Sequence, residues 1–168
     1  LEKENCYVRG INGFPFGPFH GQAVKENVFL PDWADPARLD YTQRIFKLLA
    51  ALNPQGSSGT VSTLPLTLKT FNRTQDYIKA AQKNILDCAD FLSKLRDSSG
   101  VHLRLALEPE PLGYFENTHQ TIDFFDQLRE QESSPGMVEN FIGVCYDTCH
   151  FALQYEDAIQ SIKKLNSS

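Results

Sequence analysis

Short strand-like segments alternate with longer helix-like segments along this 168-residue chain, and this alternation is the feature that most restricts its fold. The four predicted strands span Cys6–Ile11, Thr60–Leu64, Val101–Glu108 and Phe141 to Tyr146 or Asp147. A helical pattern follows each of them. Repeated strand–helix units pack as a parallel sheet joined by right-handed crossovers. We therefore predict a single α/β domain over residues 1–168, with its four strands side by side in sequence order and all parallel.

Apolar residues recur every three or four positions in the four predicted helices, as a single buried face requires. The helices begin at Asp35–Pro36, near Asn72 or Thr74, near Thr118 and near Asp157. The first three end at Asn53–Pro54, Gly100 and Ser133–Gly136. The residues expected to be buried are Leu39, Ile45, Leu48, Leu49 and Leu52, then Ile78, Ala81, Ile85, Cys88, Leu92 and Leu95, then Ile122, Phe125 and Leu128, and finally Ile159, Ile162 and Leu165.

Two architectures accommodate these units: a small doubly wound sheet, or parallel βα units forming part of a TIM (β/α)8 barrel. A complete barrel needs about 250 residues, so this chain would supply about four of the eight strands. The chain begins with Leu1 and its only methionine is Met137, which indicates a fragment or a processed piece. Half a barrel leaves its inner face and sheet edges without partners, so we expect self-association if the chain is truncated.

Composition excludes several classes of partner. The net charge is −5 and no run of Lys or Arg occurs, so we expect no nucleic-acid partner. No apolar stretch approaches the roughly 20 residues that cross a bilayer, and no signal-peptide pattern opens the chain, so we expect no membrane insertion. The four cysteines suggest no disulfide framework, and we expect a reducing, cytoplasmic location.

Two predicted strands end in groups that can carry chemistry. Leu105–Pro111 has the sequence LALEPEP, and Val144–His150 has the sequence VCYDTCH. Each is an apolar run followed by carboxylates or a histidine, as expected of a buried parallel strand that delivers reactive groups at its C-terminal end. Glu108 or Glu110 should therefore lie on the same rim of the sheet as Asp147 and His150.

Carboxylate and imidazole donors without thiolates suit Mg²⁺ or Mn²⁺, and Zn²⁺ is possible. Simpler roles remain open: Glu108 and Glu110 could belong to a solvated loop, Asp147 could cap a helix, and His150 could be a polar residue at a strand–helix junction. Cys145, Cys149 and His150 could be read as a zinc site, but they supply only three ligands and lack the paired spacing of structural sites.

The loop Asn12–Gly21, rich in glycine, proline and phenylalanine, follows the first predicted strand. Loops at the C-terminal ends of barrel strands lie on the active rim. Phe14 and Phe16 could therefore wall a pocket against the apolar side of a ligand, although packing within the loop is the simpler role. His20 and Lys25 are candidate polar contacts to the same ligand.

The motifs taken together resemble Ebo-type metabolite-traffic proteins, which belong to the xylose-isomerase-like TIM-barrel superfamily. They are Asn12–Gly21, Val24–Glu26, Pro31–Trp33, Arg38–Thr42, Ser62–Pro65, Glu108–Pro111 and Val144–His150. The resemblance covers nearly the whole chain. It implies a barrel that lacks its first strand and its last three, with a divalent metal held by carboxylates at the ends of mid-barrel strands.

The same resemblance assigns roles to individual residues. Glu108 resembles the first metal ligand and Asp147 the second, while His150 and Glu116 resemble residues that contact substrate. Glu110 to Glu116 matches the usual spacing better than Glu108 to Glu116, so the first ligand is Glu108 or Glu110.

The resemblance also sets our expectation of function. We expect a metabolite-traffic protein that binds a small polyol or sugar-like metabolite, with a divalent metal. The alternative is a metal-dependent sugar isomerase or epimerase, in which Glu116 or Glu110 moves a proton.

Overall fold

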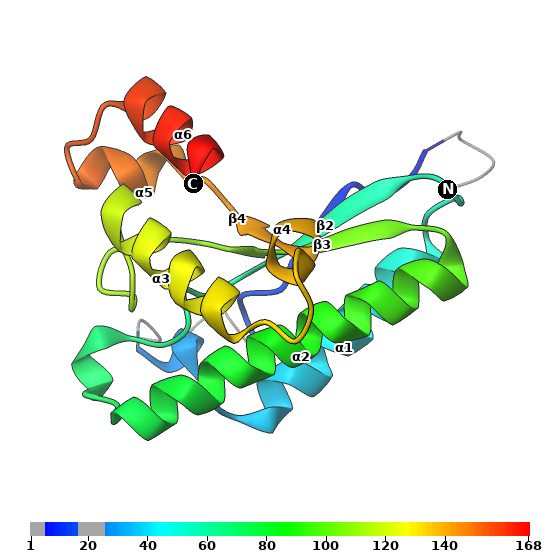
Figure 1. Cartoon of the computed structure of the whole chain (residues 1–168), viewed down its shortest axis with the longest axis horizontal. Helices are drawn as coiled ribbons and strands as arrows, with labels where there is room; N and C mark the ends of the chain where they lie inside the picture. The colour runs from blue at the N-terminus through cyan, green and yellow to red at the C-terminus, as the bar shows by residue number, and fades with distance from the viewer. Residues whose placement is uncertain (1–5, 17–25) are drawn as a thin grey trace.

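Four parallel strands lying side by side in sequence order form the centre of the structure (Figure 1). The computed structural model describes residues 6–16 and 26–168. Within them the strands are β1 (Gly10–Asn12), β2 (Ser58–Thr63), β3 (His102–Leu107) and β4 (Ile142–Val144). The pairs β1–β2, β2–β3 and β3–β4 are all parallel. The predicted α/β class, strand order and strand direction are confirmed; a barrel is neither shown nor excluded.

Helices connect the strands. The main ones are α1 (Pro36–Ala51), α2 (Gln75–Ser99) and α3 (Thr118–Gln131), followed by the short α4 (Met137–Phe141) and α5 (Thr148–Leu153) and then α6 (Ala158–Ser167). The 3₁₀ turns η2 (Asn27–Phe29) and η3 (Lys69–Phe71) lie in loops. The Asp35 side chain caps α1 by accepting from Ala37 N, and Gly100 ends α2 with a φ of 71°. Both caps are as the sequence predicted.

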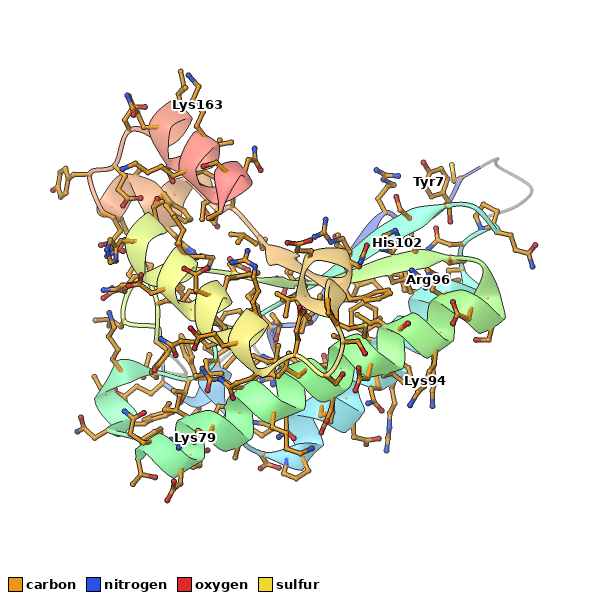
Figure 2. All side chains as sticks on the ribbon, viewed as in Figure 1. Tyr7, Lys79, Lys94, Arg96, His102 and Lys163 are labelled. Carbon is orange, nitrogen blue, oxygen red and sulfur yellow. The ribbon has the colours of Figure 1, made fainter. Side chains whose placement is uncertain are left out.

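One face of the sheet is covered by α1 and α2, which lie together below the strands in Figure 1. Leu103, Leu105 and Leu107 point to this covered face and are buried, together with the stripe from Ile78 to Leu92 of α2. On the outer side of α2, Lys79 and Lys94 are exposed (Figure 2). The opposite face of the sheet is more open, since Thr60 and Arg104 are exposed.

β3 lacks only the predicted end residues Val101 and Glu108, whereas β1 and β4 are much shorter than predicted. Pairing of Gly10 with Thr60 sets the register of β1, so Cys6 lies beyond the first residue of β2, and it is exposed. The prediction of a buried strand from Cys6 is therefore wrong. β4 is also shorter, because Phe141 belongs to α4 and the chain turns after Cys145 to enter α5.

The predicted helix faces are partly wrong. The stripe of α2 is buried as expected, but in α1 Leu48 is exposed while Phe46 is fully buried. In α6, Ile159 and Ile162 are exposed. The reason is that α6 contacts α3 and α5 rather than packing on the sheet, and its buried residue is Ser161, which hydrogen-bonds to Thr118 at 2.5 Å.

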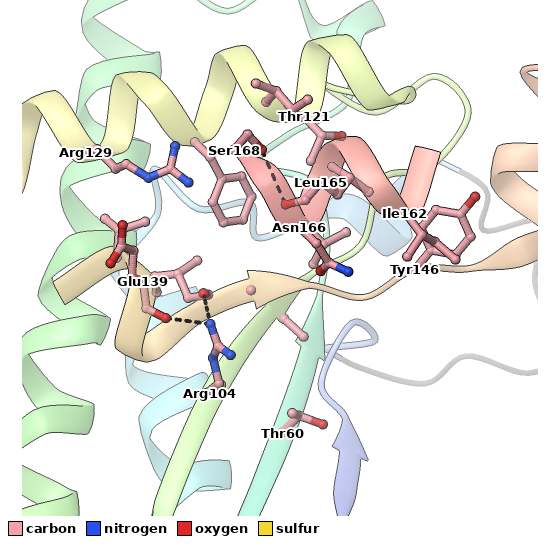
Figure 3. Close-up of a pocket in the computed structure, with 17 residues that line it drawn as sticks. Thr60, Arg104, Thr121, Arg129, Glu139, Tyr146, Ile162, Leu165, Asn166 and Ser168 are labelled. Atoms are coloured by element: carbon pink, nitrogen blue, oxygen red, sulfur yellow. Dashed lines mark hydrogen bonds between the residues drawn. The ribbon is translucent and has the colours of Figure 1, made fainter. Parts of the chain in front are cut away.

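A cavity of about 500 Å³ lies beside β4, between the strands and helices α3 and α6 (Figure 3). The Arg104 side chain extends from β3 toward α4 and β4 and donates to Glu139 O at 2.6 Å and Ile142 O at 3.0 Å. Arg129 of α3 lines the other side. In the described part of the chain, β4 pairs only with β3, so the cavity adjoins a free sheet edge.

Among the helices of residues 6–16 and 26–168, none is both long and apolar enough to cross a membrane.

Candidate metal centre

Glu108, Asp147 and His150 come together at the C-terminal end of the sheet. Each offers one ligand atom, and these atoms all lie within 4.8 Å of one another. All three side chains are half-buried. The prediction that these groups share one rim is confirmed, and together they form a group that could hold a metal ion.

Backbone pairing at the strand ends explains the position of Glu108. Its N–H donates to Thr63 O at 2.9 Å, so Glu108 continues the pairing of β3 with β2 by one residue. Pro109 follows, and its ring lacks the N–H that further pairing would need. The carboxylate is therefore carried on the residue that directly follows β3, and its backbone is still held by the hydrogen bond to β2.

Asp147 caps a helix, and its geometry also leaves room for the metal-binding role that the sequence left open. Its Oδ1 accepts from Cys149 N at 2.7 Å and His150 N at 3.3 Å, which makes it the N-cap of α5. Its Oδ2 lies 3.8 Å from His150 Nε2. One oxygen therefore caps the helix, while the other faces the histidine and is available to a cation.

The orientation of His150 is set by the segment that follows β3. Its Nδ1 lies 3.1 Å from Pro109 O and 3.7 Å from Glu108 Oε1. Pro109 O can only accept, so this hydrogen bond places the ring proton on Nδ1. In the neutral form of the ring, the lone pair is then on Nε2, the atom that faces Asp147. Histidine ligands are commonly fixed in this way by a carbonyl on the other ring nitrogen.

The electrostatics of the group favour a cation. Burial raises the pKa of Glu108, and the charge of Asp147 raises it further. His150 and a hydrogen bond with the Cys145 thiol act in the opposite direction, without reversing the shift. Two carboxylates that repel one another in a partly desolvated position are stabilised in their ionised forms by a bound cation.

The other acidic candidates are not in this group. Glu110 is half-buried, and it is not among the three residues whose ligand atoms lie within 4.8 Å of one another. The Glu116 carboxylate contacts Lys69 Nζ and accepts from Leu112 N at 2.9 Å. Catalytic roles for Glu116 and His150 stay predictions, as does a metal-binding role for Glu110.

Two of the predicted substrate contacts, Phe14 and Phe16, lie in the loop after β1. Phe14 is buried against Phe29, with ring centroids 5.3 Å apart, whereas Phe16 is exposed and packs on Tyr41. Arg38 holds this loop by donating to Gly13 O and Phe14 O. His20 and Lys25 lie outside the described residues. Substrate binding by these four candidates stays a prediction.

Sequence reasoning missed Cys145 as a neighbour of the group. Its thiol interacts with the Glu108 carboxylate, and its side chain is half-buried. Burial, together with the charges of Glu108 and Asp147, raises the pKa of the thiol to about 11. Spacing along the chain gives no signal for this contact, because it depends on the pairing of β3 with β4.

Comparison with protein-family models, curated proteins and solved structures found no match to this chain. The resemblance to Ebo-type proteins therefore remains a prediction from the motifs quoted above.

Proposed function

We propose that this chain holds a divalent cation between Glu108, Asp147 and His150, and that the cation binds a small oxygen-rich metabolite such as a polyol or a sugar. The observation that supports this most strongly is the convergence of three donors from two neighbouring strand ends to within 4.8 Å of one another. Two carboxylates and one imidazole form a donor set that Mg²⁺, Mn²⁺ and Zn²⁺ all accept.

The group is open enough to accept a ligand. Its three side chains are half-buried rather than enclosed. Three protein donors leave coordination positions for water or for hydroxyl oxygens of a metabolite, as in metal sites that act on bound molecules. Structural sites, by contrast, are closed by four protein ligands.

We further propose that the sheet is about half of a TIM barrel of the xylose-isomerase-like kind. Parallel sheets are normally covered on both faces, yet Thr60 and Arg104 are exposed on one face of this sheet. A free edge of β4 and the adjoining cavity support the same proposal (Figure 3). On this proposal, the metal group lies at the barrel mouth.

Metabolite binding and traffic is our leading proposal, and isomerase or epimerase chemistry is the alternative. The alternative needs a group that moves a proton near neutral pH. Burial acts to raise the pKa of Glu116, but its bonds to Lys69 and Leu112 N outweigh this and lower it. A carboxylate with a lowered pKa is a weak base, which favours binding over catalysis at this position.

Calorimetric titration of the metal-free protein with Mg²⁺, Mn²⁺ and Zn²⁺ tests the proposal. We expect one cation per chain, bound at least about tenfold more weakly by Glu108→Gln or His150→Gln. Glu130→Gln, on the exposed side of α3, is the matched control and should bind normally. Equal affinity in all four proteins would refute the site.

A second experiment tests the metabolite. Thermal stabilisation of the protein by xylitol or xylose only when the cation is present would support metabolite binding. Conversion of xylose to another sugar would favour isomerase or epimerase activity.

A further inference from the structure

We propose that the Cys145 thiol is a fourth donor of this centre, which makes the centre selective for Zn²⁺ over Mg²⁺ and Mn²⁺. This inference rests on the proposed cation site and specifies its chemistry.

The strand register places Cys145 directly beside Glu108. Leu107 pairs with Val144, and Cys145 N donates to Leu107 O at 2.8 Å, so the next residues along both strands, Glu108 and Cys145, face one another. Residues paired in register on adjacent parallel strands point to the same face of a sheet, about 4.8 Å apart. Cys145 is therefore carried by the same pair of strands that positions Glu108.

The side chain of Cys145 is directed toward the group. Its thiol interacts with the Glu108 carboxylate, so the sulfur lies next to one donor of the group. The donor atoms that lie within 4.8 Å of one another come from Glu108, Asp147 and His150, and the Cys145 sulfur lies outside this set. Cys149, by contrast, is exposed on the first turn of α5.

A set of one thiolate, one imidazole and two carboxylates fits four-coordinate Zn²⁺. Thiolate is a soft ligand that strengthens binding of Zn²⁺ and gives little to Mg²⁺ or Mn²⁺, which prefer oxygen. On coordination the sulfur–hydrogen bond breaks, its electron pair forms the bond to the metal, and the proton passes to solvent. No oxidant or reductant is needed.

Cobalt substitution tests the inference, because Co²⁺ occupies zinc-type sites and a thiolate ligand gives it a near-ultraviolet charge-transfer absorption. We expect this absorption in the wild-type protein and in Cys149→Ser, but not in Cys145→Ser. The weaker visible bands of Co²⁺ should persist in Cys145→Ser, since three donors remain. We also expect Cys145→Ser to bind Zn²⁺ about 100-fold more weakly and Mg²⁺ within about threefold of wild type.

The outcomes separate the two proposals. Visible Co²⁺ bands without the charge-transfer absorption in wild type would overturn the role of Cys145 and leave the three-donor site intact. Charge-transfer absorption that persists in Cys145→Ser and disappears in Cys149→Ser would also overturn it. Absence of every cobalt band from the wild-type protein would instead refute the proposed cation site.

Discussion

Asp147 caps α5 and, in the proposed centre, also carries a charge toward the cation. Its Oδ1 satisfies two backbone N–H groups at the start of α5, while Oδ2 faces Nε2 of His150. The cap needs only a hydrogen-bond acceptor, whereas a cation needs negative charge. The two roles therefore respond differently to substitution, which makes them experimentally separable.

We expect Asp147→Asn to fold with nearly wild-type stability, because Asn caps helices as well as Asp does, and to bind cations about 100-fold more weakly because the charge is lost. Asp147→Ala should lose the same affinity and also about 1 kcal/mol of unfolding free energy. Urea unfolding and metal titration of both variants measure the two effects. If Asp147→Asn keeps full affinity, the carboxylate acts only as a cap.

Glu116 provides a pH-dependent contribution to stability. Burial acts to raise its pKa, but the contacts with Lys69 and Leu112 N outweigh this and lower it. A carboxylate whose pKa is lower in the folded state stabilises the protein above its unfolded pKa of about 4.3, and this contribution is lost as the pH falls through the folded pKa.

We therefore expect Glu116→Gln to lower the free energy of unfolding by about 0.5–1 kcal/mol at pH 7, where the wild-type carboxylate is ionised. The difference from wild type should shrink as the pH falls below about 4. Urea titrations across this range, with the exposed Glu130→Gln as control, provide the measurement. A difference that does not change with pH would show that the ion pair contributes nothing.

At the scale of elements, the segment between β3 and α3 is held by unusually close backbone packing. A side chain added at Gly113 would place its Cβ 2.4 Å from Pro65 Cγ and 2.9 Å from Glu110 O. Gly113 also forms an isolated antiparallel bridge with Leu68. The segment that begins with Glu108 is thus fixed to the loop after β2, and glycine is what allows the contact.

We expect Gly113→Ala to destabilise the protein by about 1–3 kcal/mol, because the backbone must shift to admit a methyl group. Gly143→Ala is the control: the nearest atoms to its added Cβ belong to Arg104 at 3.8 Å, an ordinary contact, so its effect should stay within about 0.5 kcal/mol. Thermal unfolding of both variants gives the comparison. Equal stabilities would mean that the loop relaxes freely around position 113.

The sequence predicted elements well where local pattern and packing agree. The spacing of apolar residues by three and four in α2 correctly identifies its buried face, because that helix packs against β3, α1 and α4. The same kind of pattern failed for α6, since periodicity identifies an apolar face but not what covers it; Ile159 is exposed. The predicted strand ends were wrong for a similar reason: a strand ends where its pairing ends, and this depends on the length of the neighbouring strand.

The sequence allowed us to predict which edge of the sheet carries the candidate site, but not every residue that belongs to it. Parallel strands bring their C-terminal ends together, so Glu108, Asp147 and His150 could be grouped from the sequence alone. The choice between Glu108 and Glu110 could not be made, because both have the same strand parity. The contact between Cys145 and Glu108 depends on the register of β3 and β4, which spacing along the chain does not specify.

At the scale of the whole molecule, the free edge of β4 adjoins an exposed apolar side chain. Ile162 of α6 is exposed and lines the cavity beside that edge. Free strand edges and exposed apolar surface both promote association between chains. The arrangement accords with the expected self-association of a partial barrel.

We expect the chain to form dimers or larger species at high concentration, and Ile162→Glu to shift it toward monomer because a charge would then occupy the apolar surface. Gln160→Glu introduces the same charge at an exposed position of α6 and should not change association. Light scattering during size-exclusion chromatography, over a range of concentrations, measures the state. A monomeric wild-type protein at every concentration would contradict the expectation.

The hydrogen bond from His150 Nδ1 to Pro109 O links the proposed centre to the segment that follows β3. In the proposed centre, this ring would join the nitrogen that faces the cation to the segment that leaves β3. Cation binding and ordering of that segment would then be thermodynamically coupled. The coupling would be reciprocal: a cation that favours the bonded ring orientation would stabilise the segment by the same free energy by which the ordered segment strengthens cation binding. Substitutions beyond Pro109 would then change cation affinity without contacting the cation.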